Sequence, residues 1–388
     1  MSAEPGGAAV CSVFATFAVG GPQRRFAALA NRFPGRYRHR IVAMDGNTAA
    51  RDLLAAEAGC AFPPIDTAKR TTLANRARFR AALRAWRPDL LVTNNWGSIE
   101  WAMADLPRLV PHLHIEDGFG PEEQATQLPR RVLTRRLVLR WSRVVVPSRT
   151  LLDIATTIWR LPSSRVHYIP NGIDLAPYAA APLAPLPERA PGTLVIGTVA
   201  ALRVEKNLIR LLDAFRMVQE RQPALLVIVG DGAEAARLKG HAAALGLVDR
   251  VIFPGHVPAP AGWYRGFDIF ALSSDTEQMP LSVIEAMAAS LPVVATDVGD
   301  VRRMLAAENA PYVVAKDAEA LAGAILALAA DPARRAALGA ANRAEAARSY
   351  DQETMFAAYA ALFDAAMGPA RQASQAYQSR PIYSWKAK

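Results

Sequence analysis

The strongest constraint on the fold is an alternation, repeated in both halves of the chain, between short Val/Ile-rich runs and longer stretches of helical period. The short apolar runs predict buried strands, and the Ala-, Leu- and Arg-rich stretches between them predict helices. Strands that alternate with helices form a parallel sheet with helices on both faces. The sequence therefore predicts an α/β protein with two Rossmann-like, doubly wound domains facing each other across a cleft.

A Pro/Ala-rich stretch separates the two halves of the 388-residue chain, which exceeds the ~100–200 residues of one typical domain. Proline removes an amide donor and disfavours helix, so this stretch reads as a linker. We predict an N-terminal domain over 1–174, a linker over 175–192, a C-terminal domain over 193–349, a terminal helix over 350–369 and a tail over 370–388.

The expected elements show where ligand-binding loops should be sought. Strands are expected at 10–17, 40–44, 90–93, 109–115, 143–147, 166–169, 194–199, 225–229, 251–253, 269–272 and 292–295. Helices are expected at 22–33, 75–86, 128–140, 207–219, 233–244, 318–330, 332–349 and 352–367. Ligands of such folds bind beyond the carboxyl ends of the strands, so the loops that follow strands are the candidates.

The net charge of +10 is confined to the first half of the chain. Residues 1–190 hold 25 basic and 15 acidic side chains, which leaves 20 of each for the rest. Arginines interleaved with apolar residues in 76–87 and 130–143 predict contact with an anionic membrane surface. Ordinary solvated helix faces are the alternative. Nucleic acid is not expected as a partner, because no known binding module is present.

Cysteine content and hydropathy indicate the compartment. Cys11 and Cys60 are too few for a disulfide framework or a structural zinc site. The first basic residue is Arg24, so a secretory signal is not expected. The apolar run 320–330 is well short of the ~20 residues that span a bilayer. We expect a cytoplasmic protein, peripheral at the inner face of the cytoplasmic membrane.

The segment from Gly230 to Ala235 matches the G-x-G-x-x-G/A fingerprint of dinucleotide-binding proteins. That interpretation requires an acidic residue after the next strand, to bind the ribose. The strand 251–253 is followed by Pro254 and Gly255 instead, which disfavours a nicotinamide cofactor. A tight strand-to-helix turn remains the structural alternative for these glycines.

Two further segments carry charged side chains in loops after strands. Glu277 and Glu285 are separated by seven residues and bracket Pro280, near the start of an expected helix. The free amides and positive dipole end of such a helix favour an anion, and flanking carboxylates can accept hydrogen bonds from sugar hydroxyls. Arg203 and Lys206 stand at another helix entrance, where they could converge on a diphosphate.

The combination of motifs resembles the family 4 glycosyltransferases, which have the GT-B fold. The motifs in chain order are Gly20-Gly21, Val146-Pro147-Ser148, Ile169-Pro170-Asn171-Gly172-Ile173-Asp174, Arg203…Glu205-Lys206-Asn207, Val229-Gly230-Asp231-Gly232, Pro254-Gly255 and the segment from Glu277 to Glu285. The resemblance spans residues 10 to about 365 and implies that the terminal helix packs back on the N-terminal domain.

The resemblance implies a role for each matching residue. Glu277 would contact the hydroxyls of the donor sugar, Glu285 would bind the ribose, and Arg203 with Lys206 would stabilise the departing nucleoside diphosphate. Further donor contacts are expected at Gly20, Gly21, Gly230, Gly255, Met279, Pro280, Leu281 and Ser282. The C-terminal domain would thus bind the nucleotide sugar, and the N-terminal domain would bind the acceptor.

The family commonly has a histidine in the N-terminal domain that faces the donor sugar. His112 and His114 are both candidates here; we choose His114, because it lies nearer the carboxyl end of its strand. Glu116 or Asp117 could orient the acceptor hydroxyl or take its proton. Gln278 departs from the family, in which Gly is usual before Met-Pro, and its side chain would bias the donor pocket.

These features together predict a hexosyltransferase-type glycosyltransferase that retains anomeric configuration. It would transfer a sugar from a nucleotide-diphosphate sugar, UDP- in preference to GDP-, to a lipid-linked or glycan acceptor in cell-envelope polysaccharide or glycolipid biosynthesis. No cofactor and no metal ion are expected, in keeping with the lack of a D-x-D motif at the usual position. The alternatives are a noncatalytic GT-B protein that binds a nucleotide sugar, and a nucleotide-sugar epimerase or hydrolase.

Overall fold

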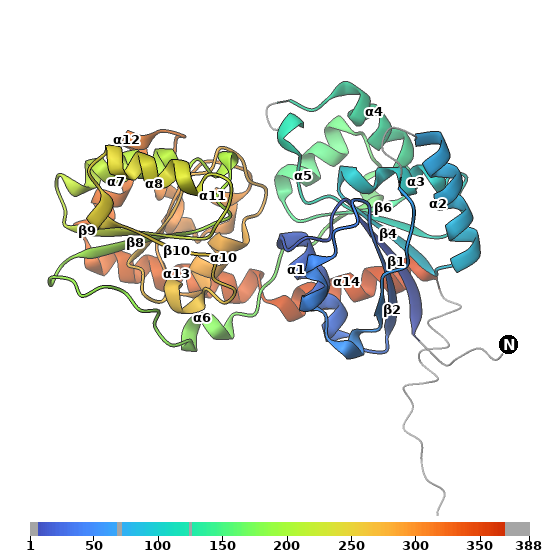
Figure 1. Cartoon of the computed structure of the whole chain (residues 1–388), viewed down its shortest axis with the longest axis horizontal. Coiled ribbons are helices and arrows are strands. Elements are labelled where there is room, and N and C mark those ends of the chain that lie inside the picture. The colour runs from blue at the N-terminus through green and yellow to red at the C-terminus, as the bar shows by residue number, and fades with distance from the viewer. Residues whose placement is uncertain (1–6, 68–71, 124–125, 369–388) are drawn as a thin grey trace, which may run out of the picture. The chain divides into compact units, whose positions relative to one another are not determined.

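The computed structural model describes residues 7–67, 72–123 and 126–368, which form two units (Figure 1). Of the described residues, unit 1 comprises those up to Val146, Leu151–Ile169 and those from Phe356 onward. Unit 2 comprises Pro147–Thr150 and Pro170–Met355. Each unit is built on one parallel sheet with helices on both faces, which confirms the predicted α/β class.

The sheet of unit 1 has the strand order β3-β2-β1-β4-β5-β6-β7. Its strands are β1 (Ala8–Phe14), β2 (Tyr37–Ala43), β3 (Cys60–Ala61), β4 (Leu90–Asn94), β5 (His112–Ile115), β6 (Arg143–Val146) and β7 (Val166–Tyr168). Its helices include α1 (Gly21–Arg32), α2 (Thr72–Trp86), α3 (Ile99–Ala104) and α4 (Pro129–Val138), and α5 (Arg149–Asp153) enters it at Leu151. The chain winds from β1 toward β3 and then returns to β4, so the strand order reverses between β1 and β4.

The sheet of unit 2 has the order β10-β9-β8-β11-β12-β13 and reverses between β8 and β11. Its strands are β8 (Leu194–Val199), β9 (Ala224–Val229), β10 (Val251–Gly255), β11 (Ile269–Leu272), β12 (Val293–Thr296) and β13 (Val313–Val314). Its helices are α6 (Ala176–Ala180), α7 (Leu208–Gln219), α8 (Ala235–Ala244), α9 (Ala261–Tyr264), α10 (Leu281–Ala288), α11 (Val301–Met304), α12 (Ala318–Ala329) and α13 (Pro332–Ser349).

Two apolar layers bury the sheet of unit 2. Residues of α7, α8 and α12 pack on one face of the sheet, and residues of α10 and α13 pack on the other (Figure 1). The strands are buried on both faces, as parallel strands between helix layers are. The sheet therefore holds the loops at its carboxyl ends, where the predicted site residues lie, on a rigid base.

The terminal helix α14 (Gln352–Met367) belongs to unit 1 from Phe356 onward. The hydroxyl of Tyr37 in β2 donates to Asp364 Oδ1 at 3.1 Å, and Arg36 pairs with the same carboxylate. The ring of Phe356 packs edge-on against Phe33. Helix α14 therefore completes the core of the N-terminal unit.

The Pro/Ala-rich stretch 175–192, which is predicted to be a linker, groups with unit 2. Its residues include the short helix α6, and the amide of Ala184 donates to the carbonyl of Gly262 at 3.1 Å. The guanidinium of Arg265 donates to the carbonyl of Ala181. Proline lacks an amide but keeps its carbonyl, so such a segment can still be held against a neighbouring helix.

Small differences from the expected elements have local causes. The strand expected from residue 109 begins at His112, because Asp105 Oδ1 accepts the amides of Leu109 and Val110 and holds them in a turn. The shortest elements, β3 and β13, are two residues long. Periodicity cannot be read from segments of that length.

Candidate active site

The central feature of unit 2 is an ion pair at the point where its strand order reverses. Lys206 lies in the loop after β8 and Glu277 in the loop after β11, and these strands are neighbours in the sheet. The Lys206 ammonium lies 2.5 Å from Glu277 Oε1, which also accepts from the Ser274 hydroxyl at 2.8 Å. The two predicted groups are thus brought together, in the position where doubly wound folds bind ligands.

Polar contacts clamp the two loops that carry this pair. The Ser273 hydroxyl donates to the Lys206 carbonyl at 3.0 Å, and the Asp275 amide donates to the Glu205 carbonyl at 2.8 Å. Asn207 adopts a left-handed conformation with φ of 40°, and its side-chain amide donates to Asp275. The loop geometry is therefore fixed by the backbone as well as by the ion pair.

Arg203 occupies a different environment from Lys206. Its side chain is 66% exposed and lies 4.0 Å from Glu205, so the structure does not join it to the pair of Lys206 and Glu277. Arg203 is the N-cap of the 3₁₀ turn Val204–Lys206, and Lys206 is the last residue of that turn. The role of Arg203 in holding a diphosphate remains a prediction.

Helix α10 presents its N-terminus directly after Glu277. Pro280 is the N-cap, with an extended backbone, so the first helical amides, of Leu281 and Ser282, have no acceptor inside the helix. Met279 is buried, and its carbonyl accepts from the Asn171 side chain at 3.2 Å. The predicted donor contacts at 279–282 therefore form one continuous, held segment with free amides at a positive helix end.

Gly299 is required beside this loop, although sequence reasoning did not select it as a site residue. Its φ is 52°, and a Cβ at this position would lie 2.3 Å from the Glu277 carbonyl oxygen and 2.8 Å from that of Gln278. Only glycine tolerates both the left-handed conformation and this close approach. The conformation of the Glu277 backbone is thus set by a residue after β12.

The side chain of Gln278 bonds to the segment 147–150, which groups with unit 2. Gln278 Oε1 accepts from the Ser148 hydroxyl at 3.1 Å. Asp300, which is buried, accepts the amide and the hydroxyl of Thr150 at 3.0 and 2.7 Å, and its own amide donates to the Gln278 carbonyl. The side chain that departs from the family pattern thus anchors the loop.

Glu285 lies in the second turn of α10 and is half-buried. Its Oε2 accepts from the hydroxyl of Tyr264, in α9, at 2.6 Å. Burial, reinforced by the charge of Glu285, raises the pKa of Tyr264 well above its usual value, so the phenol stays protonated as a donor. Sequence reasoning missed Tyr264, because no motif links it to a glutamate 21 residues away.

The glycines of the G-x-G segment are explained by close packing. A Cβ on Gly230 would lie 1.8 Å from the Ala200 carbonyl oxygen, and one on Gly232 would lie 2.4 Å from that of Leu202. The Gly230 amide donates to the carbonyl of Gly255, which has a φ of 80°. These contacts account for a tight strand-to-helix turn, and donor contacts at Gly230 and Gly255 remain predictions.

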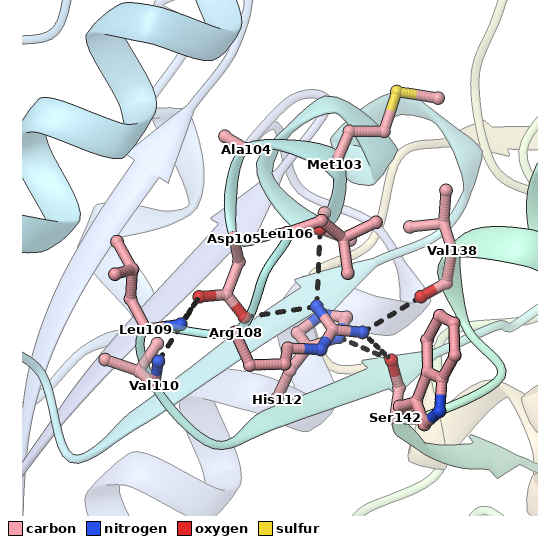
Figure 2. A network of polar contacts seen from close by, with 12 residues as sticks. Met103, Ala104, Asp105, Leu106, Arg108, Leu109, Val110, His112, Val138 and Ser142 are labelled. Carbon is pink, nitrogen blue, oxygen red and sulfur yellow. Dashed lines mark hydrogen bonds and ion pairs between the residues drawn. The ribbon is translucent and has the colours of Figure 1, made fainter.

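In unit 1, His112 and His114 lie on the same face of β5, as strand alternation predicts. Both rings lie 2.8 Å from the Thr93 hydroxyl. His112 is held by Ser142, which accepts from Arg108 at 2.6 Å, and this network also includes Asp105 (Figure 2). Burial lowers the pKa of His112 well below its usual value. His112 is therefore part of a structural network.

His114 lies at the carboxyl-terminal side of β5, next to a buried glutamate. Its Nε2 is 3.5 Å from Glu116 Oε2, and both side chains are fully buried. Glu116 Oε2 also accepts from Arg135 Nε at 3.1 Å, whereas Glu116 Oε1 has no hydrogen-bond partner among the described residues. Of the two histidines, His114 is the one that contacts Glu116, and its contact with a donor sugar remains a prediction.

Asp117 does not stand free at the end of β5. Its carboxylate pairs with Arg25 of α1 through both oxygens, one of them at 2.9 Å. Its amide donates to Asn95 Oδ1 at 2.7 Å. Burial opposes the charge on Arg25, but the charge of Asp117 outweighs it and raises the pKa of Arg25. The carboxylate is thus held in one orientation, and its role in the reaction remains a prediction.

Gly20 and Gly21 begin α1, at the carboxyl end of β1. Gly20 is the N-cap with an extended backbone, and a Cβ there would meet only the Gln23 side chain, at 2.8 Å. That side chain donates to the Thr16 carbonyl at 2.9 Å. The approach of a diphosphate to the backbone of these two glycines remains a prediction.

The prediction that all arginines of 130–143 contribute to a basic surface is wrong for two of them. Arg131 and Arg135 are buried. Arg135 donates two hydrogen bonds to Glu123, at 3.0 and 3.1 Å, and Arg131 donates one to the same carboxylate at 3.0 Å. The Arg135 guanidinium also lies 5.0 Å from the centre of the Trp159 ring. Acidic side chains from the loop after β5 neutralise these arginines, and that pairing cannot be read from helical periodicity.

In the ranges that the structure describes, no cluster of three or more His, Cys, Asp or Glu side chains is arranged to hold a metal ion. No helix within those ranges combines the length and the apolar character needed to cross a bilayer.

Comparison with known proteins places the chain in a family. The model of group 1 glycosyl transferases matches residues 187–345, and that of family 4 glycosyltransferases matches residues 19–177. A lipopolysaccharide core biosynthesis mannosyltransferase of Rhizobium leguminosarum bv. viciae is 27% identical over 313 residues, which cover 76% of this chain and 85% of that protein.

Two solved structures are similar over nearly their whole length. The sucrose-phosphate synthase of Thermosynechococcus elongatus aligns with a TM-score of 0.75 at 22% identity, covering 95% of this chain and 100% of that one. Anabaena Alr3699/HepE, in complex with UDP and glucose, aligns with a TM-score of 0.74 at 18% identity, covering 92% and 99%. With the two family models matching successive halves, the chain belongs to the family 4 glycosyltransferases of the GT-B fold and is a hexosyltransferase-type enzyme, as the sequence predicts.

Proposed function

We propose that the chain transfers a sugar from a nucleotide-diphosphate sugar to a lipid-linked or glycan acceptor, with retention of anomeric configuration, in cell-envelope polysaccharide or glycolipid biosynthesis. The observation that carries the proposal is the pair of Lys206 and Glu277 beside the free N-terminus of α10. A cation and a helix N-terminus bind a diphosphate, and a fixed carboxylate accepts hydrogen bonds from sugar hydroxyls.

Each group near the pair has a task in this proposal. Lys206 and the amides of Leu281 and Ser282 stabilise the negative charge that develops on the leaving diphosphate. Glu277, held by Ser274, accepts hydrogen bonds from the donor sugar. Glu285, oriented by Tyr264, accepts from the ribose hydroxyls. The departing phosphate takes the proton of the acceptor hydroxyl on the face from which the acceptor attacks, so the configuration is retained.

We propose UDP rather than GDP as the donor nucleotide and unit 1 as the acceptor-binding unit. The similar Anabaena protein, crystallised with UDP and glucose, supports UDP. The relatedness to a lipopolysaccharide core mannosyltransferase supports a cell-envelope acceptor. The basic excess of residues 1–190 supports a cytoplasmic, peripheral enzyme at an anionic membrane surface. Charge stabilisation is assigned to side chains and amides, without a metal ion or a cofactor.

The proposal is tested by incubating the purified chain with a panel of UDP- and GDP-sugars and a bacterial lipid extract. Release of nucleotide and a product mass increased by one sugar are expected with one donor, and the anomeric proton of the product reports retention. Release that does not depend on the extract indicates a hydrolase, and an altered sugar without transfer indicates an epimerase. Binding without turnover indicates a noncatalytic protein. Addition of EDTA should leave turnover unchanged.

A further inference from the structure

Helix α4 in unit 1 presents an apolar row to solvent. Leu133, Leu137 and Trp141 follow one another at four-residue intervals along the helix and the turn after it, and each is 55–56% exposed. At 1.5 Å of rise per residue the row would extend about 12 Å. Large apolar side chains that gather on one exposed side mark an interaction surface rather than chance exposure.

Exposed, positively charged arginines surround this row. Arg130, Arg136 and Arg140 are exposed, and no ion pair neutralises any of them within the described ranges. The segment 129–141 contains no acidic residue. The Arg140 guanidinium lies 5.6 Å from the centre of the Trp141 ring, and Arg165 donates to the Trp141 carbonyl at 3.0 Å. The row therefore has a rim of cations.

The side of α4 opposite the apolar row carries arginines whose charge is already neutralised within the protein. Arg131 and Arg135 face the protein and are paired with Glu122, Glu123 and Glu116. These ion pairs fix the rotation of the helix, because a turn about its axis would unpair buried charges at a large cost. The apolar row and its three exposed arginines are thereby directed outward.

We propose that this surface, formed by Leu133, Leu137, Trp141, Arg130, Arg136 and Arg140 and named the α4 patch, binds the surface of a bilayer that contains anionic lipid. The proposal rests on the proposed function only in that a lipid-linked acceptor is reached at such a surface. Leucine and tryptophan enter the boundary between headgroups and acyl chains, and the arginines bind headgroup phosphates.

Charge distinguishes the bilayer from other occupants. A second copy of the chain in a two-fold contact would bring the same arginines against each other. A nucleic acid would engage the arginines but leave the apolar row without a partner, since its affinity comes from phosphate contacts. An anionic bilayer satisfies the cations and the apolar row at once, which neither a second copy nor a nucleic acid does.

The test is co-sedimentation of the full chain with phosphatidylcholine vesicles prepared with and without phosphatidylglycerol, at low and high salt. We expect binding to vesicles that contain phosphatidylglycerol and weaker binding as salt rises. Arg136→Glu with Arg140→Glu should lower the affinity by more than about tenfold. Leu133→Ser with Leu137→Ser should lower it at both salt concentrations, because the apolar contribution is not screened.

The matched control carries the same charge change elsewhere in unit 1. Arg84 and Arg87 are exposed at the carboxyl-terminal end of α2, and no ion pair among the described residues involves them, so Arg84→Glu with Arg87→Glu should retain most of the binding. Equal losses in the two double variants would overturn the α4 patch in favour of overall charge. Absence of binding to phosphatidylglycerol vesicles, or a concentration-dependent dimer abolished by the leucine variant in place of vesicle binding, would also overturn it.

The readouts separate this proposal from the proposed function. Vesicle binding is measured without a nucleotide sugar, with circular dichroism to verify that each variant is folded. A chain that binds vesicles but transfers no sugar from any donor contradicts the proposed function alone. A chain that transfers sugar but shows no loss of vesicle binding in the α4 variants contradicts the α4 patch alone.

Discussion

Lys206 Nζ lies 2.5 Å from Glu277 Oε1, although 71 residues separate the two in sequence. Their side chains are only 23% and 10% exposed, so the contact is better shielded than a surface ion pair. The family resemblance assigns one residue to the diphosphate and the other to the sugar. The structure adds that each holds the other in place, which makes the two roles interdependent.

We predict that Lys206→Ala lowers kcat by roughly 10²–10³-fold, because a cation that stabilises the leaving diphosphate is lost. The fold should remain, since Lys206 is partly exposed at the end of its loop. Lys239→Ala, at an exposed position of α8, is the matched control and should have near-normal kcat. Steady-state nucleotide release and thermal melting measure both quantities. Near-normal turnover of Lys206→Ala would exclude it from the site.

Glu277→Gln should also reduce kcat, by roughly 10²-fold or more. The side-chain oxygen of the glutamine can still accept the hydrogen bond from the Ser274 hydroxyl. The amide preserves the shape of the side chain but removes the charge that positions Lys206 and binds the sugar. Because the two residues act as a unit, the double variant with Lys206→Ala should lose less than the product of the single losses. Fully multiplicative losses would show that the ion pair does not couple them.

Tyr264→Phe removes the hydroxyl that orients Glu285 and nothing else. We expect KM for the donor to rise several-fold with little change in kcat, because the ribose contact is made equally in the ground and transition states. Tyr312→Phe, at a partly buried position away from α10, serves as the control. A fall in kcat without a change in KM would place Glu285 in the chemical step rather than in nucleotide binding.

Arg135→Met should destabilise the protein by about 3–5 kcal/mol, because the buried carboxylates of Glu116 and Glu123 lose their shared partner. Arg136→Met changes the neighbouring, exposed residue and should alter stability by less than about 0.5 kcal/mol. Urea unfolding of the two variants gives the comparison. Similar unfolding midpoints would mean that the buried cluster contributes little.

Stability should fall on acidification below about pH 6.5. Burial lowers the pKa of His39 to about 4, whereas the unfolded chain has a histidine pKa near 6.5. Between these values the unfolded state binds a proton that the folded state does not, so His39 costs up to about 3 kcal/mol at pH 4. His39→Phe, which can pack on Phe26, should flatten this dependence in urea titrations.

The exposed His256 provides the control for this pH dependence, and His256→Gln should leave it unchanged. His112 is also buried with a lowered pKa, so it adds a contribution of the same sign that remains in the His39 variant. An unchanged slope in His39→Phe would assign the whole effect to other groups.

Much of the candidate donor site could be predicted, because its elements have signals that are local in the sequence. The strand 269–272, the loop with Glu277 and the helix start after Pro280 follow one another within a short segment. Each has its own signal in the sequence: an apolar run for the strand, a proline for the end of the loop, and an apolar helical period for the helix. The partners of these residues could not be predicted. Gly299 and Tyr264 reach the segment only through the packing of β12 and α9.

The arginines of α4 also show that sequence patterns do not reveal which residues become partners. Helical period and composition predict a basic helix, and they are correct about the helix. They cannot distinguish Arg135, fully buried against Glu116 and Glu123, from Arg136, which is exposed. The two residues are adjacent and chemically identical. They differ only in that, among the described residues, the acidic loop after β5 contacts Arg135 and does not contact Arg136.

The sequence by itself determined the α/β class, the two parallel sheets and the family, because buried strands, helix periods and loop motifs are local properties. Tertiary structure alone decided that Lys206 meets Glu277, that Asp117 is bound by Arg25, and which arginines remain exposed. The physical reason is strand order. Because β8 lies beside β11 in the sheet, the loops after these strands are close in space although they are far apart in the sequence. The energy of an ion pair depends on the distance between the charges and not on their separation in the sequence.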